Sequence, residues 1–171
     1  MHEVILVDSE DNELGTAEKY PPHMYPMKLH RAFSVFVLNA EGQLLIHRRG
    51  KDKRTWPDFW TNTCCSHPRP NEPVEIAAAR RLKEELGFEC DLKFLFKFEY
   101  QAKYNEEYGE YELDHVFLGH YDGDVKPDPS EVAEFKFVDL SYLEKDMKEN
   151  PEKYTPWFKI SFPRVLEHIR K

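Results

Sequence analysis

One segment, residues 73–86, predicts an amphipathic helix whose two ends are both marked in the sequence. Pro73 suits the first turn of a helix, and Gly87 is a common residue directly after one. The apolar residues of the segment recur at helical spacing: Ile76, Ala79, Leu82 and Leu86. The helix ends in the acidic pair Glu84 and Glu85, so the most regular element of the chain also carries two carboxylates.

Strands precede and follow this helix in the sequence. Apolar runs predict strands at residues 3–8, 33–38, 43–48, 92–101, 111–121 and 135–140. We expect residues 9–15 to form a turn, residues 39–42 to close a β-hairpin, and residues 105–109 to be the polar tip of another strand pair. Two more helices are expected at residues 141–149 and 156–169. This order of elements indicates an α+β fold, a mixed α/β/α sandwich.

Length and composition limit the class of protein. A chain of 171 residues is long enough for one domain and short for two, so we expect a single domain at residues 1–171. The net charge of −8 argues against a nucleic-acid or membrane partner, because both need a basic surface. No apolar run approaches the roughly 20 residues that cross a bilayer, and the start of the chain lacks the basic residues of a signal peptide. Three cysteines, two of them adjacent, make a poor disulfide framework, so we expect a cytoplasmic protein.

The segment Cys65-Ser66-His67-Pro68 holds the first candidate site residues. In an extended strand, residues two apart share a face, so Cys65 and His67 would point the same way and Cys64 the opposite way. A thiol and an imidazole, followed by a helix that ends in two carboxylates, are the parts of a metal-assisted active site. We therefore expect Cys65 to do chemistry and Cys64 to pack.

Further candidate metal ligands lie on both sides of this segment. Glu110 and Glu112 alternate along a predicted strand, so their carboxylates share one face. His23 and His30 flank a proline-rich segment. Taken singly, these are also the marks of a loop histidine or of acids on a solvated strand. Together with His67 they suit a divalent metal bound through nitrogen and oxygen.

The helix resembles the Nudix box, whose spacing is matched by Glu72, Arg80, Leu82, Glu84, Glu85, Gly87 and Phe88. In Nudix proteins a loop–helix–loop presents glutamates to a divalent metal that grips a diphosphate. Two positions depart from the pattern, because Ser66 replaces its leading glycine and Arg81 replaces the glutamate after the central arginine. That glutamate belongs to the carboxylate cluster for diphosphate cleavage. The resemblance thus implies a Nudix-like fold without the full hydrolytic apparatus, and Arg81 would present a cation to phosphate oxygens.

Residues 61–68, together with the modified helix and the pair Glu110 and Glu112, resemble the type I isopentenyl-diphosphate isomerases. The similarity extends from about His23 to Trp157, which is most of the chain. It implies an isomerase that interconverts isopentenyl and dimethylallyl diphosphates by a 1,3-allylic proton shift. The expected partner is therefore a small isoprenoid diphosphate, and we expect a monomer or a weak homodimer.

The resemblance also implies a role for individual residues. The catalytic residues would be Cys65, Glu112 and Tyr100. The ligands of one divalent metal, Mn²⁺, Zn²⁺ or Mg²⁺, would be His23, His30, His67, Glu110 and Glu112. A second ion, the Mg²⁺ that accompanies the diphosphate, would be held through Glu85. The substrate would be bound by Lys19, Arg49, Lys53, Arg81 and Trp157.

The chemistry of an alkene explains this choice of residue types. Protonation of an unactivated alkene passes through a state close to a tertiary carbocation, so the site needs an acid on one face and a base on the other. We expect Glu112 with its metal to deliver the proton and Cys65 to act as the base or proton shuttle. Trp157 would close over the hydrocarbon and stabilise the cation. Residues 47–54 gather cations for the diphosphate, and strand alternation makes Arg48 the one that faces away.

Two alternatives make different demands on the sequence. A Nudix hydrolase of a nucleoside diphosphate derivative needs the full carboxylate cluster, and Arg81 argues against it. A non-catalytic zinc-binding module would use Cys64, Cys65 and His67. Structural zinc sites usually draw four ligands from paired motifs, and the chain has no second motif of that kind.

Overall fold

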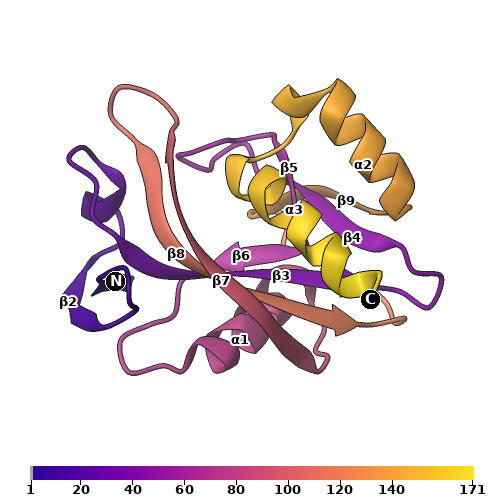
Figure 1. Ribbon diagram of the computed structural model, residues 1–171, viewed down its shortest axis with the longest axis horizontal. Coiled ribbons are helices and arrows are strands. Elements are labelled where there is room, and N and C mark those ends of the chain that lie inside the picture. The colour runs from indigo at the N-terminus through magenta and orange to yellow at the C-terminus, as the bar shows by residue number, and fades with distance from the viewer. Residues whose placement is uncertain (1) are drawn as a thin grey trace.

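The protein is described by a computed structural model of residues 2–171, in which a mixed sheet runs between helices (Figure 1). The strands are β1 (Glu3–Val7), β2 (Glu13–Glu18), β3 (His30–Leu38), β4 (Leu44–Arg49), β5 (Trp60–Thr61), β6 (Cys64–Ser66), β7 (Leu92–Lys103), β8 (Gly109–His120) and β9 (Val132–Val138). The helices are α1 (Val74–Leu86), α2 (Leu140–Glu149) and α3 (Pro156–Ile169), with the short 3-10 turns η1 (Pro21–His23) and η2 (Pro151–Lys153). The three expected helices are confirmed.

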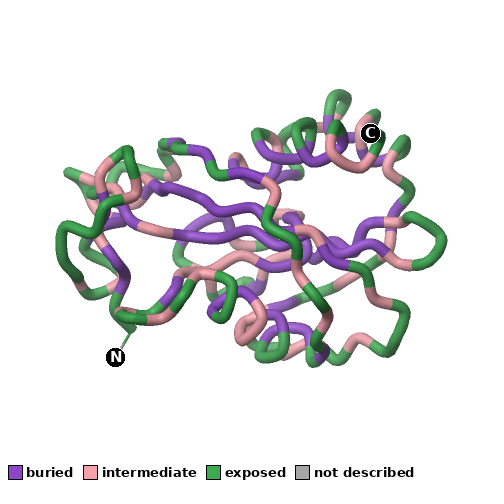
Figure 2. The backbone as a smooth tube through the Cα atoms, turned by 60° about the horizontal axis from the view of Figure 1, so that its bottom comes forward, coloured by how far each residue is buried: buried purple, intermediate pink, exposed green. Residues whose placement is uncertain are grey.

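Strand β3 is buried on both faces and separates two apolar cores. Its side chains alternate, so Phe33, Val35 and Val37 pack on the side of α1. Phe36 and Leu38 point to the other side and pack with residues of α2 and α3. The buried strands pass through the middle of the molecule in Figure 2, with helices above and below them. This arrangement confirms the expected α/β/α sandwich.

The prediction of a hairpin between residues 33–38 and 43–48 is wrong except for its turn and one strand pair. The turn forms, but β3 and β4 share only the pair Leu38 and Leu44. Strand β6 pairs antiparallel with β3 at Phe33–Val35, on the edge that a continued hairpin would need. Strand β8 runs parallel along the whole opposite edge of β3, while β4 pairs with β9. A strand has two edges, and more distant segments occupy both of them.

Two other expectations also need correction. The turn predicted at residues 9–15 is shorter, because β2 begins at Glu13 and pairs with β1. The buried face of α1 is rotated from the predicted one. Ile76 is 56% exposed, whereas Ala77, Ala78 and the carboxylate residue Glu85 are buried. The apolar pattern misplaced this face because a charged side chain forms part of it.

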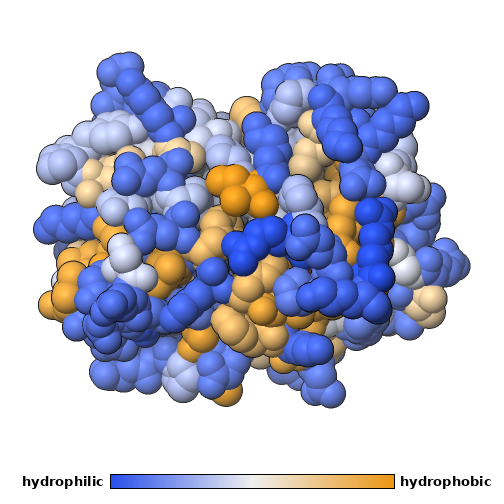
Figure 3. Space-filling model, viewed as in Figure 1, coloured by the Kyte–Doolittle hydropathy of each residue, from blue (hydrophilic) through white to orange (hydrophobic). Residues whose placement is uncertain are grey.

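The outer surface is mostly polar on the face shown in Figure 3, where apolar surface occurs as patches crossed by hydrophilic side chains. No helix within residues 2–171 combines the length and apolarity needed to cross a membrane.

Candidate active site

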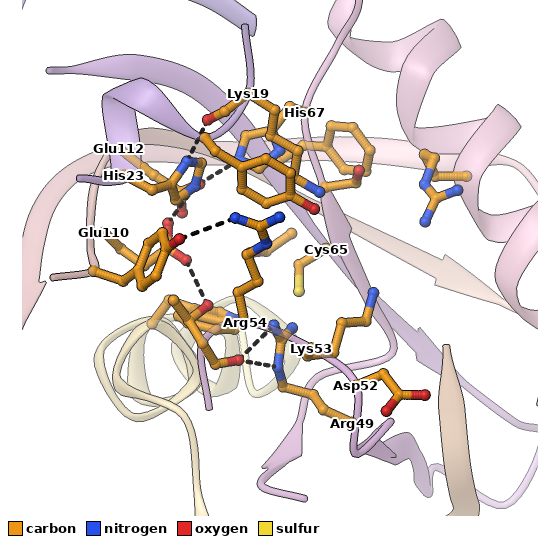
Figure 4. A pocket seen from close by; sticks show the side chains of 18 residues that line it. Lys19, His23, Arg49, Asp52, Lys53, Arg54, Cys65, His67, Glu110 and Glu112 are labelled. Atoms are coloured by element: carbon orange, nitrogen blue, oxygen red, sulfur yellow. Dashed lines mark hydrogen bonds and ion pairs between the residues drawn. The ribbon is translucent and has the colours of Figure 1, made fainter. Parts of the chain in front are cut away.

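Most of the predicted site residues line one cavity of about 160 Å³. They are Lys19, His23, Arg49, Lys53, Cys65, His67, Arg81, Glu110, Glu112 and Trp157. The other three, His30, Glu85 and Tyr100, are buried and contact this lining from behind. Figure 4 shows Cys65 between His23, Glu110 and Glu112 on one side and Arg49 and Lys53 on the other.

The fold gathers three histidines and two glutamates at one end of this cavity. The parallel register of β3 and β8 places His30 opposite Glu112. Alternation along β8 puts Glu110 on the same face, η1 supplies His23, and His67 follows β6. One potential ligand atom from each residue lies within 4.8 Å of the others.

The histidine rings are oriented as metal ligands usually are. His23 Nδ1 lies 2.7 Å from the carbonyl oxygen of Lys19, and His30 Nδ1 lies 2.9 Å from that of Lys28. A carbonyl oxygen accepts a hydrogen bond, so Nδ1 of each ring carries the proton and Nε2 is left to face the cluster. Metal-bound histidines commonly use the second ring nitrogen in this way.

Two buried atoms of the cluster lack a hydrogen bond. Within residues 2–171, neither His30 Nε2 nor Glu110 Oε2 makes a hydrogen bond of good geometry. His30 Nε2 is 3.3 Å from a Glu112 oxygen, and Glu110 Oε2 is 2.9 Å from His23 Nε2. Buried polar atoms are rarely left unsatisfied, so the cluster fits a divalent cation bound through imidazole and carboxylate. The donor set alone does not distinguish Mn²⁺, Zn²⁺ and Mg²⁺.

Burial and pairing shift the pKa values of these groups. Burial lowers the pKa of His67 to about 3, so its ring is neutral and able to bind a metal. Burial opposes the charge on His23, but the carboxylate of Glu110 raises the pKa of His23 to about 9. Burial also opposes ionisation of Glu112, yet the hydrogen bond with His67 and the nearby ring of His30 hold the pKa of Glu112 well below its usual range.

Cys65 and Glu112 face the same cavity from different strands. Tyr100 donates its hydroxyl hydrogen bond to Glu112 Oε1, and His67 Nε2 lies 2.6 Å from Glu112 Oε2. Burial raises the pKa of Cys65 to about 12, so its thiol is neutral in the metal-free protein. Cys64 points to the opposite side of β6, as expected, and donates its S–H to Glu85.

The other end of the cavity is cationic. Lys19, Arg49, Lys53 and Arg81 all line it, and the pKa of Lys19 is lowered by burial and by the charge of Lys53. Arg49 is already engaged, because its guanidinium donates to the carbonyl oxygens of Thr55 and Trp56. It thus holds the loop between β4 and β5 as well as facing the cavity. Arg48 pairs with Asp58 at 2.7 Å, away from the cavity lining, as predicted.

Trp157 closes one wall of the cavity. Its indole N–H donates to Thr61 Oγ1 at 3.1 Å, which fixes the ring at the start of α3. The Arg49 guanidinium carbon lies 5.2 Å from the centre of the ring, and Trp56 packs edge-on at 5.6 Å. The aromatic face therefore already contacts a cation in this structure.

Arg54 and Glu131 lie at the site but were not among the site residues expected from the sequence. Arg54 lies 3.7 Å over the ring of Tyr20 and donates to the Tyr108 hydroxyl at 2.9 Å, which joins three segments that line the cavity. Glu131, directly before β9, accepts a hydrogen bond from Arg81. Arg54 stood within the recognised basic run, but Glu131 belongs to no motif, and only tertiary packing brings it here.

Comparison with known proteins agrees with this geometry. The NUDIX domain model matches residues 28–158. An isopentenyl-diphosphate Delta-isomerase of Aromatoleum aromaticum is 44% identical over 96% of this chain and 86% of its own length. Another, from Burkholderia multivorans, is 40% identical over 95% of this chain and 92% of its own length. The chain belongs to the isopentenyl-diphosphate Delta-isomerase family.

Solved structures confirm the Nudix fold of this isomerase family member. A crystal structure of a Deinococcus radiodurans protein superposes with a TM-score of 0.78 at 18% identity, over 95% of this chain and 98% of that one. A MutT protein from Methanosarcina mazei gives 0.69 at 21% identity, over 84% of this chain and 96% of that one. At these identities the likeness shows the fold alone.

Membership of the isomerase family also decides between the alternatives. Arg81 stands where a hydrolytic Nudix box has a glutamate, and in the structure it pairs with Glu84 and Glu131. The zinc-module hypothesis fails on geometry, because Cys64 and Cys65 lie on opposite faces of β6 and cannot bind one ion together.

Proposed function

We propose that this protein interconverts isopentenyl diphosphate and dimethylallyl diphosphate at the cavity between Cys65 and Glu112. The observation that carries the proposal is the order of groups along this cavity. The histidine–glutamate cluster lies on one side of the Cys65 thiol and Arg49 and Lys53 lie on the other, while Lys19 and Arg81 also line the cavity. This order suits a substrate with an anionic head and a short hydrocarbon tail.

The diphosphate would bind at the cationic end, where Lys19, Lys53 and Arg81 face the cavity. Charge-assisted hydrogen bonds from such groups are stronger than neutral ones. Glu85, buried beside Arg81, would hold the Mg²⁺ that accompanies the diphosphate. This placement leaves the hydrocarbon near Cys65 and Glu112.

The reaction moves one proton onto the substrate and removes another. The group facing the terminal carbon protonates it, which leaves a cation at the tertiary carbon. The group facing the CH₂ next to that carbon then takes a proton, and the double bond forms there. Cys65 and Glu112 are the proposed pair, and each reverses its role when the reaction runs backwards. The formal reduction of the terminal carbon balances the oxidation of the carbon that loses its proton, so the reaction needs no external oxidant or reductant, and the diphosphate stays attached.

The surroundings would support this proton shift. Tyr100 and His67 hold the two oxygens of Glu112 in place. Trp157 offers an aromatic face worth about 0.5–2 kcal/mol to a nearby cation. His23, His30, His67, Glu110 and Glu112 would hold the divalent metal, whose positive charge would tune the acidity of the groups around it.

We also propose a cytoplasmic, monomeric or weakly dimeric protein. All three cysteines are free thiols, which suits a reducing compartment. Sedimentation of the purified protein over a range of concentrations tests the oligomeric state, and elemental analysis of protein purified without added metal identifies the ion at the histidine–glutamate cluster.

The experiment that tests the function is incubation with isopentenyl diphosphate and Mg²⁺ in deuterated water, followed by NMR. We expect dimethylallyl diphosphate with deuterium in a methyl group, because the added proton comes from exchangeable groups. Nucleoside diphosphate derivatives should release no phosphate or monophosphate. Hydrolysis of those compounds without isomerisation would overturn the proposal in favour of a hydrolase.

A further inference from the structure

The carboxylate of Glu131 contacts two of the cationic side chains that line the site, Arg81 and Lys53. It accepts a hydrogen bond from Arg81 Nη2 and lies 3.6 Å from Lys53 Nζ. It also lines a second cavity of about 120 Å³, which shares Lys19, Lys53 and Arg81 with the first. An acid therefore stands among the cations assigned to the diphosphate.

The position of Glu131 is fixed by its backbone. The segment before it docks on the end of α1, where Asp128 N donates to the carbonyl oxygen of Glu85 at 2.8 Å. The carbonyl oxygen of Glu131 accepts from Gly50 N at 2.9 Å, at the start of the loop that carries Lys53. The backbone at Glu131 is thus held between the end of α1 and Gly50.

Arg81 shows how strongly these acids engage the cations. Its Nη1 donates to Glu84 at 2.6 Å, its Nη2 donates to Glu131, and Glu85 Oε1 lies 3.5 Å away. Its Nε is buried and has no hydrogen-bond partner in the part of the chain that the structure describes. The positive charge of Arg81 is therefore balanced by the neighbouring carboxylates, and its buried Nε–H remains available to another acceptor.

This charge arrangement disfavours the binding of a diphosphate without a divalent cation. A diphosphate would gain attraction from Lys53 and Arg81 but would approach Glu85 and Glu131. Burial raises the pKa of Glu85 to about 7, so Glu131 carries the larger share of the repelling charge near neutral pH. In a partly buried site such repulsion is only weakly screened. A divalent cation bound beside these carboxylates would cancel their charge and leave the cations free to bind the anion.

We propose that Glu131 makes diphosphate binding depend on Mg²⁺, because its carboxylate holds Arg81 and Lys53 and repels the anion until the cation arrives. The inference rests on the proposed function, in which this end of the cavity takes a diphosphate with Mg²⁺. Glu131 acts through Arg81 and Lys53 and is a positioning residue.

The coupling between Mg²⁺ binding and diphosphate binding can be measured directly. The affinity for inorganic diphosphate is measured by calorimetry with and without Mg²⁺, on wild type and on Glu131→Gln. We expect Glu131→Gln to bind diphosphate ~10-fold more tightly without Mg²⁺, and the gain from adding Mg²⁺ to shrink by a similar factor, since coupling between two ligands is typically about 5–150-fold. Formation of the magnesium–diphosphate complex in solution is common to both proteins and cancels in the comparison.

Two control variants separate this role from a structural one. Glu131→Asp keeps the charge and should keep most of the Mg²⁺ dependence. Glu134→Gln removes an exposed acid of β9 that lies near Arg48, and it should behave as wild type. The proposal is overturned if Glu131→Gln leaves the Mg²⁺ dependence unchanged, or if it weakens binding equally with and without Mg²⁺. If wild type binds diphosphate under neither condition, the proposed function fails together with the inference.

Discussion

The neighbouring thiols of Cys64 and Cys65 meet different surroundings on the two faces of β6. Cys65 lines the cavity that also contains Glu112. Cys64 is fully buried in the core under α1 and contacts Glu85. The chemical difference between them therefore comes from orientation and not from residue type.

Replacement of each thiol by a hydroxyl should separate these environments. We expect Cys65→Ser to lose activity by ~10²–10⁴-fold, because a hydroxyl is a much weaker proton-transfer group than a thiol. Cys64→Ser keeps a donor for Glu85 and should retain most of the activity. Turnover is measured by NMR on both variants, with circular dichroism to confirm folding. Equal losses in the two variants would contradict the assignment.

Glu110 and Glu112 should also differ, although both lie in the metal cluster. Glu112→Gln keeps an oxygen donor but cannot carry a proton, so it should keep much of the bound metal and lose turnover by ~10²–10⁴-fold. Glu110→Gln should lose activity in proportion to the metal that it loses, and added Mn²⁺ or Zn²⁺ should partly restore it. Metal content and turnover are measured together. Equal rescue of both variants would make Glu112 a ligand only.

His47 gives a prediction about pH and stability. It is buried on β4, and burial lowers its pKa to about 3, against about 6.5 in the unfolded chain. Folding favours the neutral ring of His47. The stability that follows from this preference is fully present above pH 6.5 and is lost as the pH falls towards 3. As the pH falls over this range, the free energy of unfolding should decrease more steeply for wild type than for His47→Gln. The two slopes should differ by up to about 1.4 kcal/mol per pH unit. Equal slopes in urea titrations of both proteins would contradict this prediction.

At the scale of elements, the end of α1 positions part of the site. Gly87 ends the helix with φ of 75°, a conformation that favours glycine. Lys126 N donates to the carbonyl oxygen of Leu86, which docks the segment leading to Glu131. A Cβ at residue 87 would lie 2.7 Å from the carbonyl oxygen of Lys126. The helix stop and the docking of this segment are therefore linked.

Substitution of two glycines tests this link. Gly42 has a similar φ of 74° but nothing within 4 Å of an added Cβ, so Gly42→Ala should cost about 1 kcal/mol from backbone strain alone. Gly87→Ala should cost roughly 1–3 kcal/mol more, because the new methyl group overlaps a backbone oxygen. Chemical denaturation of both variants measures the difference. Similar losses would show that the contact with Lys126 relaxes freely.

At the scale of the whole molecule, the metal cluster joins η1, β3, β8 and the segment after β6. Mn²⁺ or Zn²⁺ that binds only the folded chain should raise the melting temperature, by roughly 5–10 °C at a hundredfold excess over the dissociation constant. His30→Ala should lose most of this shift, whereas the exposed His120 can be replaced by alanine without effect. A full shift in His30→Ala would place the ion elsewhere.

Local chain geometry made a large part of this site predictable. The faces shared by Cys65 with His67, and by Glu110 with Glu112, follow from the two-residue period of a strand. The end of α1 at Gly87 follows from backbone conformation. The resemblance to isopentenyl-diphosphate isomerases supplied the family and the roles of individual residues, and those roles remain predictions.

Tertiary structure alone decided which segments meet. The sequence pattern favoured a β3–β4 hairpin, but β6 and β8 occupy the two edges of β3, and the pairing with β8 is what sets His30 against Glu112. Glu131 enters the cationic end for the same kind of reason, because its segment docks on α1. Periodicity reports which face of an element is buried. The partner that covers that face or pairs with that edge is chosen by competition among segments far apart in the chain.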